Sequence, residues 1–161
     1  MKQLKGCSER IYKMGSLEKV KIEILSPIAV VPSRGSDSAA GYDLFAALEE
    51  NVDIAPRETK QIPIGIALEI PEGFFGAIYA RSGLATTQGL RPANCVAIID
   101  SDYRGEISVP IHNDSPLPRV VFPRERVAQI VIQPHLSIEF VEEELSDTKR
   151  GKKGFGSTGG F

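Results

Sequence analysis

The chain has 161 residues, of which 42% are apolar and 25% are charged, and its formal net charge is −2. This length suits one domain, which can bury a core large enough to fold without a disulfide or a structural metal. A charge this close to zero argues against nucleic acid or an acidic membrane as a partner, and no apolar run is long enough to span a bilayer. The two cysteines, Cys7 and Cys95, make neither a disulfide framework nor a thiolate zinc site, which favours a reducing cytoplasm.

Residues 1–18 are polar and mildly basic. They lack the apolar core of a secretory signal, so a solvated N-terminal extension is expected. Glu9 and Glu18 argue against a transit peptide, although targeting to an organelle or the nucleus stays open beside a cytoplasmic location. Met14 is a second candidate start, because the regular pattern begins only after it.

Apolar residues recur with a period of two from residue 20 onward, which is the spacing of β-strands with one buried face. Val20, Ile22 and Ile24 alternate with charged residues, and residues 61–70 place an isoleucine or a leucine at every second position. Pro63 within this run indicates an edge or a bulge. Further short strands are predicted over 74–79, 96–99, 107–111, 120–122, 127–133 and 138–141, and the strand over 96–99 is predicted to be buried.

Only one segment is predicted to be helical. Ser82 can cap a helix over 83–88, and Gly89 can end it in a left-handed conformation. Because many prolines and glycines separate the short strands, we predict an all-β jelly roll, sandwich or barrel over residues 19–149 with this one short helix. Residues 150–161 are rich in glycine and show no strand or helix pattern, so we expect them to form a mobile C-terminal arm.

Several common catalytic and binding motifs are absent from the sequence. His112 and His135 have no second histidine or cysteine at metal-ligand spacing. There is no P-loop and no Gly-x-Ser-x-Gly nucleophile elbow. Five short polar segments remain as candidates for the chemistry.

The first two segments combine small residues with one charged side chain. In Ala39–Leu44, Asp43 stands among apolar neighbours after a glycine, and its structural alternative is a turn aspartate. In Ala80–Leu84, Arg81 and Ser82 mark the passage from strand to helix, where backbone N–H groups and a guanidinium can hold phosphate. The structural alternative here is a serine N-cap beside a surface arginine.

The third segment, Ile99–Gly105, follows an apolar strand directly. Asp100 stands at the strand end, where a carboxylate can hold and deprotonate a water molecule. Tyr103 adds a flat ring close by. A hairpin turn explains the same residues structurally, and both interpretations are compatible because functional residues concentrate on such loops.

The last two segments lie near the end of the chain. Arg126–Gln129 opens a strand with polar residues, and ordinary outward-facing polarity is its alternative. Arg150–Gly159 combines cations that meet phosphates with glycines that let the backbone wrap a ligand. Phe155 lies between glycines and can stack on a base. The alternative for this segment is a disordered basic tail.

Taken in order, the five segments resemble those of the trimeric dUTPase family, over residues 39–159. The resemblance implies a β jelly roll and a homotrimer with three sites at its subunit interfaces. It also implies a C-terminal arm that closes over a neighbour's site. The expected activity is hydrolysis of dUTP to dUMP and diphosphate, with Mg²⁺ as the cofactor.

The resemblance also implies roles for individual residues. Asp100 would be the general base that activates water for attack on the α-phosphorus, and Tyr103 would lie under the deoxyribose and exclude a 2′-hydroxyl. Asp43 would sit in the outer shell of Mg²⁺. The hairpin over 94–99 would read the uracil edge through Asn94, Ala97 and Ile98. The phosphates would be held by Arg81, Ser82, Gly83 and Gln129. The tail would contribute Arg150, Phe155, Gly156, Ser157 and Thr158, with Phe155 over the uracil and Arg150, Ser157 and Thr158 at the γ-phosphate.

Two residues depart from the usual pattern of the family. Ala97 stands where glycine is usual, and uracil selectivity would suffer if that position required a positive φ. Arg124 stands where glycine is often found. Two alternatives stay open: a dCTP deaminase, which shares the fold but uses a glutamate where this chain has Pro-Ile-His-Asn at 110–113, and a nucleotide-binding module of the same fold that has lost catalysis.

Overall fold

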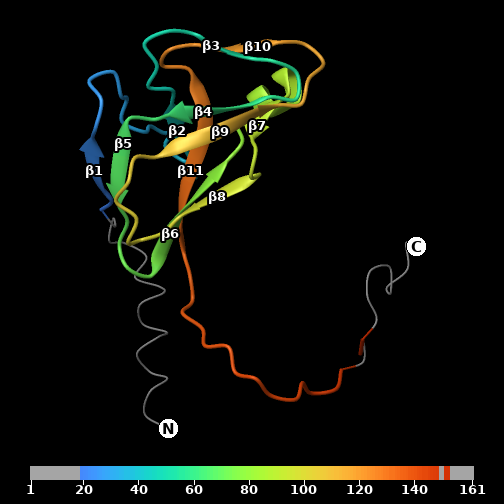
Figure 1. Cartoon of the computed structure of the whole chain (residues 1–161). Helices are drawn as coiled ribbons and strands as arrows, with labels where there is room; N and C mark the ends of the chain where they lie inside the picture. Colours follow the sequence, from blue (N-terminus) through green and yellow to red (C-terminus); the bar gives the residue numbers. More distant parts are fainter. Residues whose placement is uncertain (1–18, 149–150, 153–161) are drawn as a thin grey trace.

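Every strand pairing is antiparallel in residues 19–148 and 151–152, the part of the chain that the structure, a computed structural model, describes. The largest sheet contains, in spatial order, β2 (Tyr42–Phe45), β11 (Arg126–Pro134), β6 (Phe74–Tyr79) and β8 (Val96–Ile99). A second sheet contains β4 (Thr59–Pro63), β9 (Ser108–Asn113) and β7 (Leu90–Pro92). Two ribbons complete the body, β1 (Lys21–Ile24) with β5 (Ile66–Glu69) and β3 (Val52–Ile54) with β10 (Arg119–Val121). The predicted all-β jelly roll is confirmed (Figure 1).

The isoleucine-rich run over 61–70 supplies much of the core. Its predicted inward face is confirmed, because Ile62, Ile64, Ile66, Leu68 and Ile70 are all buried. The run does not form one strand, however: β4 ends before residue 64 and β5 begins at residue 66. The break falls at Gly65, whose φ is 72°. A Cβ there would lie 2.9 Å from the Ala29 side chain, so both the turn and the packing require glycine at this position.

The strand β8 is present as predicted, but its predicted burial is wrong. Val96 and Ile98 are exposed, and Ile98 keeps 54% of its accessible surface. The reason is the place of β8 at the edge of the largest sheet, where among the described strands it pairs with β6 alone. An edge strand leaves one row of backbone N–H and C=O groups open to another molecule.

The predicted short helix is present as a π-helical turn, η1 (Leu84–Gln88). Gly89 ends it with a φ of 71°, and its N–H donates to the carbonyls of Ala85 and Leu84, as predicted for a left-handed cap. The predicted Ser82 cap is wrong, because the N-cap residue is Gly83. Gly83 already has helical backbone angles, and no side chain makes a capping hydrogen bond at this end of the turn. Ser82 does not cap the turn, and it is exposed.

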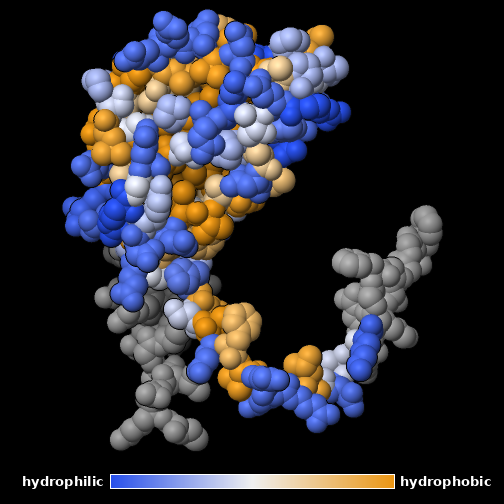
Figure 2. All heavy atoms as spheres, viewed as in Figure 1, coloured by the Kyte–Doolittle hydropathy of each residue, from blue (hydrophilic) through white to orange (hydrophobic). Residues whose placement is uncertain are grey.

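After β11 the chain leaves the body as an extended arm (Figure 1). The strand predicted over 138–141 is wrong for a single chain, because these residues have no pairing partner among the described strands. Apolar and hydrophilic side chains are interspersed along the arm (Figure 2), and Phe140 is 92% exposed. No helix within the described ranges is long and apolar enough to cross a membrane. The predicted extension over 1–18 and most of the predicted tail lie outside the described residues.

Candidate active site

Strand register brings three of the five polar segments side by side. Gln129 of β11 pairs with Asp43 of β2 on one side and with Tyr79 of β6 on the other. Arg81 lies two residues after Tyr79, and its side chain reaches Asp43, so Asp43, Gln129 and Arg81 form one row across the three strands. These residues lie far apart in the sequence, and only the antiparallel pairing of β2, β11 and β6 gathers them.

Two arginines share the carboxylate of Asp43. Arg81 donates through Nε to Asp43 Oδ1 at 2.9 Å, and Arg126 donates through Nη1 to Oδ2 at 3.2 Å. Arg81 Nη1 also donates to the carbonyl of Arg126 at 3.1 Å. Two guanidinium groups against one carboxylate leave one positive charge in excess, which suits an anionic ligand such as a phosphate. Arg126 was not among the predicted site residues, although its place at the start of the fourth segment was a signal for it.

The side chain of Gln129 is held in the same row. Its Nε2 donates to the Ala80 carbonyl at 2.9 Å, and its Oε1 lies against Gly41. A Cβ at Gly41 would overlap that amide, so the Gln129 side chain keeps this place only beside a glycine. Ser82 and Gly83 are exposed and follow Arg81 directly. The structure therefore brings Asp43, Arg81 and Gln129 together, with Ser82 and Gly83 directly after Arg81, and the roles expected for them in binding phosphate and Mg²⁺ stay predictions.

The predicted magnesium site also falls on this cluster. Within residues 19–148 and 151–152 no group of three or more His, Cys, Asp or Glu side chains could hold a metal ion. Asp43 already accepts from both arginines. This donor set does not fit a metal held by protein ligands alone. It fits Mg²⁺ that is bound mainly by phosphate oxygens and retained waters, with Asp43 beyond the inner shell.

The predicted base-reading hairpin is a tight turn followed by β8. The N–H of Cys95 donates to the Pro92 carbonyl at 3.1 Å, and the N–H of Val96 donates to the Asn94 carbonyl at 2.7 Å. Cys95 has a φ of 62°, and Asn94 is exposed at the tip. Ala97 is not among the residues with positive φ and pairs with Ile78 in the ladder. The requirement for glycine at Ala97 is thus removed, because its backbone is ordinary extended strand.

Asp100 and Tyr103 lie in one turn directly after β8. The N–H of Tyr103 donates to the Asp100 carbonyl at 3.2 Å, and the Tyr103 hydroxyl donates to the Glu106 carbonyl at 3.0 Å. The ring lies over Gly105, where a Cβ would be 2.7 Å from the Tyr103 Cζ. Both Asp100 and Tyr103 are exposed in the single chain, and Asp100 lines a cleft of about 930 Å³.

Asp100 and the arginine cluster lie at opposite ends of the β6–β8 ladder. Ile99, next to Asp100, pairs with Gly76, whereas Val96 pairs with Tyr79 near Arg81. At about 3.3 Å per residue this ladder spans roughly 10 Å, and Asp100 and Arg81 lie beyond its opposite ends. One chain therefore does not bring Asp100 next to its own Arg81. The sequence offered no signal for this separation, which follows from strand pairing alone.

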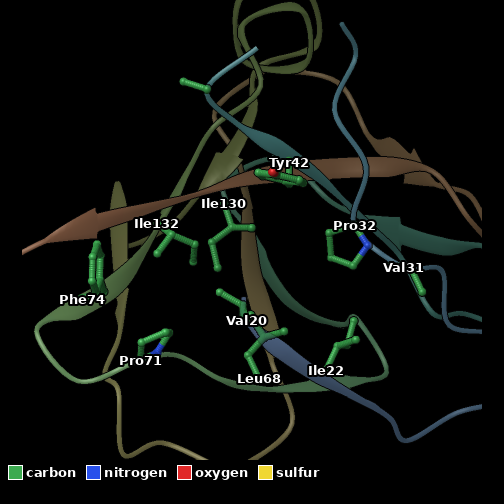
Figure 3. A pocket seen from close by; sticks show the side chains of 11 residues that line it. Val20, Ile22, Val31, Pro32, Tyr42, Leu68, Pro71, Phe74, Ile130 and Ile132 are labelled. Carbon is green, nitrogen blue, oxygen red and sulfur yellow. The ribbon is translucent and has the colours of Figure 1, made fainter. Parts of the chain in front are cut away.

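A separate apolar cavity of about 420 Å³ lies between β1, β2, β5 and β11 (Figure 3). Val20, Ile22, Leu68, Ile130 and Ile132 point into it. None of the predicted site residues that the structure describes lines it, and its apolar lining is unsuited to a triphosphate. Of the predicted tail residues, Arg150, Phe155, Gly156, Ser157 and Thr158 lie outside the described part of the chain.

Comparison with known proteins gives a consistent result. A family model described as dUTPase matches residues 28–159. The deoxyuridine 5'-triphosphate nucleotidohydrolase of Desulfitobacterium hafniense (strain DSM 10664 / DCB-2) is 46% identical over 131 residues, which cover 80% of this chain and 87% of the relative. That of Nautilia profundicola is 46% identical over 142 residues, which cover 88% and 99%. The solved structure of Staphylococcus bacteriophage 80alpha dUTPase with dUPNHPP superposes with a TM-score of 0.80 at 31% identity, covering 89% of this chain and 99% of that one. A mutant dUTPase from phage phi11 of S. aureus, solved with a structural Mg(II) ion, gives a TM-score of 0.72 at 26% identity, covering 80% and 98%.

Proposed function

The chain belongs to the dUTPase family, and from this membership we propose that it hydrolyses dUTP to dUMP and diphosphate through water activated by Asp100. The observation that carries the proposal is the row formed by Asp43, Gln129 and Arg81, with its excess positive charge beside exposed Ser82. A triphosphate needs neutralising charge along its length, and this row supplies fixed donors that need no rearrangement on binding.

Phosphate binding falls to Arg81, Ser82, Gly83 and Gln129. Asp43 keeps the Arg81 guanidinium in one orientation. Binding of the ligand therefore costs less side-chain conformational entropy than it would with a free arginine. Arg126 shares that carboxylate and adds to the positive field. Mg²⁺, when bound, would neutralise phosphate oxygens and orient the triphosphate, with Asp43 meeting one of its waters.

Uracil recognition falls to the hairpin that carries Asn94, Ala97 and Ile98. Since β8 is an edge strand, its open backbone groups can pair with the carbonyl and N–H groups on the uracil edge. Asn94 adds a side-chain amide at the tip, which can donate and accept. The ordinary extended backbone at Ala97 supports normal uracil selectivity despite the missing glycine.

The chemical step follows from the place of Asp100. Its carboxylate accepts a proton from a water molecule, whose oxygen bonds to the α-phosphorus while the bond to the bridging oxygen breaks and diphosphate leaves. General base assistance contributes roughly 10²–10⁴-fold, and ideal placement of the water contributes up to about 7–11 kcal/mol. The Tyr103 ring is held by its bond to the Glu106 carbonyl and lies against Gly105. In the proposed site it would lie under the deoxyribose and exclude a 2′-hydroxyl.

A complete site needs a second subunit, and we assign a homotrimer with sites at its interfaces. The separation of Asp100 from Arg81 along β6–β8 supports this assignment, because another copy must supply one of the two. The arm supports it too, since Leu136, Ile138 and Phe140 are exposed at alternate positions and lack cover in one chain. The tail residues Arg150, Phe155, Gly156, Ser157 and Thr158 would then close over a neighbour's site and exclude bulk water.

Pyrophosphate release, measured side by side on dUTP, dTTP, dCTP and UTP with Mg²⁺, tests the proposal. We expect efficient release from dUTP alone. Equal turnover of all four nucleotides would contradict uracil and deoxyribose selection. Ammonia released from dCTP would identify a deaminase instead, and dUTP binding without pyrophosphate release would identify a silent binding module.

A further inference from the structure

Arg91 lies in β7, the strand that leads into the base-reading hairpin. Its side chain donates hydrogen bonds to the backbone of that hairpin. Its Nη1 donates to the Pro92 carbonyl at 3.1 Å and to the Ala93 carbonyl at 3.3 Å. The same nitrogen lies 3.9 Å from the Sγ of Cys95. One guanidinium thus contacts the residues on both sides of Asn94, the tip residue assigned to the uracil.

Asp114 fixes the other side of this guanidinium. Arg91 donates through Nε to Asp114 Oδ2 at 2.6 Å and through Nη2 to Oδ1 at 3.3 Å, which is the two-pronged geometry that orients an arginine most firmly. The N–H of Asp114 in turn donates to the Gly89 carbonyl at 2.8 Å. The bond from Arg91 is the main reason that the pKa of the Asp114 carboxyl lies below its ordinary value, so the pair is charged at neutral pH.

The position of β7 in its sheet does not depend on the Arg91 side chain. Backbone pairing already joins Arg91 to His112 and Pro92 to Ile111 across β7 and β9. The turn that follows is different, because Cys95 has a φ of 62° and the N–H of Val96 reaches back only two residues to Asn94. A residue other than glycine keeps such a backbone only when its surroundings fix it. The Arg91 bonds are contacts of that kind.

We propose that Arg91, anchored by Asp114, is a positioning residue for base recognition, which holds the turn that presents Asn94 to the nucleobase. This inference rests on the proposed function, because it assigns Arg91 to the uracil-reading half of that site. Arg91 does not touch the reacting phosphate in this assignment. Its loss should therefore affect the affinity for the base and the choice of base, and leave the chemical step largely intact.

The test is Arg91→Lys in the full chain, which keeps the charge but removes the fork. We expect KM for dUTP to rise roughly tenfold, as for loss of bonds to a charged group, with little change in kcat. The preference for dUTP over dCTP in kcat/KM should fall by a similar factor. The dissociation constant of dUMP, measured by calorimetry, should rise in parallel. Asp114→Asn should give the same pattern through the other partner.

Arg119→Lys is the matched control, because Arg119 bonds Ser115 Oγ at 3.2 Å and its loss leaves the Arg91 bonds in place. Unchanged KM, base preference and dUMP affinity in Arg91→Lys would overturn the positioning role. If that variant does not fold, unchanged dUMP affinity in Asp114→Asn overturns it. A wild type that binds dUMP but does not turn over dUTP refutes the proposed function, and the dUMP titration of the variants still decides the role of Arg91.

Discussion

Gly41 lies directly against the side-chain amide of Gln129, so that a Cβ built on Gly41 would overlap Gln129 Oε1. The other end of that amide donates to the Ala80 carbonyl at 2.9 Å. One glycine thus determines where the side chain proposed to bind phosphate lies, although Gly41 itself carries no functional group.

Gly41→Ala should therefore displace the Gln129 amide from its place beside Asp43 and Arg81. We expect kcat/KM for dUTP to fall roughly tenfold, which is the order expected for losing one hydrogen bond to a charged ligand. Gly35→Ala is the matched control, because a Cβ at Gly35 has no atom within 4 Å. Steady-state kinetics of both variants give the result, and equal activity of the two would refute the packing role of Gly41.

The position of the Tyr103 ring depends on Gly105 in a similar way. A Cβ at Gly105 would lie 2.7 Å from Tyr103 Cζ, so Gly105→Ala should move the ring. Both Gly105→Ala and Tyr103→Ala should let UTP compete roughly tenfold better against dUTP, because the barrier to a 2′-hydroxyl is a matter of space. Tyr103→Phe keeps the ring and should keep the discrimination. Inhibition constants for UTP measure the effect, and unchanged values in both alanine variants would count against the ribose role.

Arg124, the second departure from the usual family pattern, has a φ of 60°. Left-handed geometry costs a residue other than glycine roughly 1–2 kcal/mol, and glycine in turn adds about 0.5–1 kcal/mol of backbone entropy to the unfolded state. Arg124→Gly should thus raise the free energy of unfolding slightly, by about 0.5–1 kcal/mol. Arg119→Gly, within β10, should lower it. Urea denaturation distinguishes them, and a similar loss of stability in both variants would show that Arg124 is not strained.

Residues 150–161 are proposed to close the active site and not to stabilise the fold. Removal of residues 150–161 should leave a folded trimer, because in the described part of the chain the core residues and the strand pairings lie before residue 135. Turnover of dUTP should be largely lost, since bulk water would then reach the site. Light scattering reports the assembly and pyrophosphate release reports the activity. Full activity in the truncated chain would refute the closing role of this segment.

Local patterns in the sequence predicted the fold well. The inward face of residues 61–70 was predictable because side-chain direction alternates along any strand. The break at Gly65 was not predicted, because the regular alternation of residues 61–70 favoured one strand, although a glycine inside such a run often marks a bulge or a bend. The exposure of Ile98 depends on which strands flank β8, and strand order is decided by contacts between residues distant in sequence.

The site was predicted in its parts but not in its arrangement. Asp43, Arg81 and Gln129 each belong to a recognisable segment, and the structure joins them through register. Arg126 was missed as a partner of Asp43, because only the shift of register between Arg126 and Ala128 decides which side chains meet. The bond between Arg91 and Asp114 was also missed, since it joins β7 to the residue directly after β9, and only the pairing of these two strands brings them together.

Asp100→Asn tests the central claim most directly, with Asp102→Asn in the same exposed turn as its control. The amide keeps the size of the carboxylate but does not accept a proton from water at neutral pH. If Asp100 is the general base, kcat for dUTP should fall by roughly 10²–10⁴-fold, while KM and the dissociation constant of dUMP stay close to wild type. Hydrolysis that continues undiminished in Asp100→Asn would contradict the account.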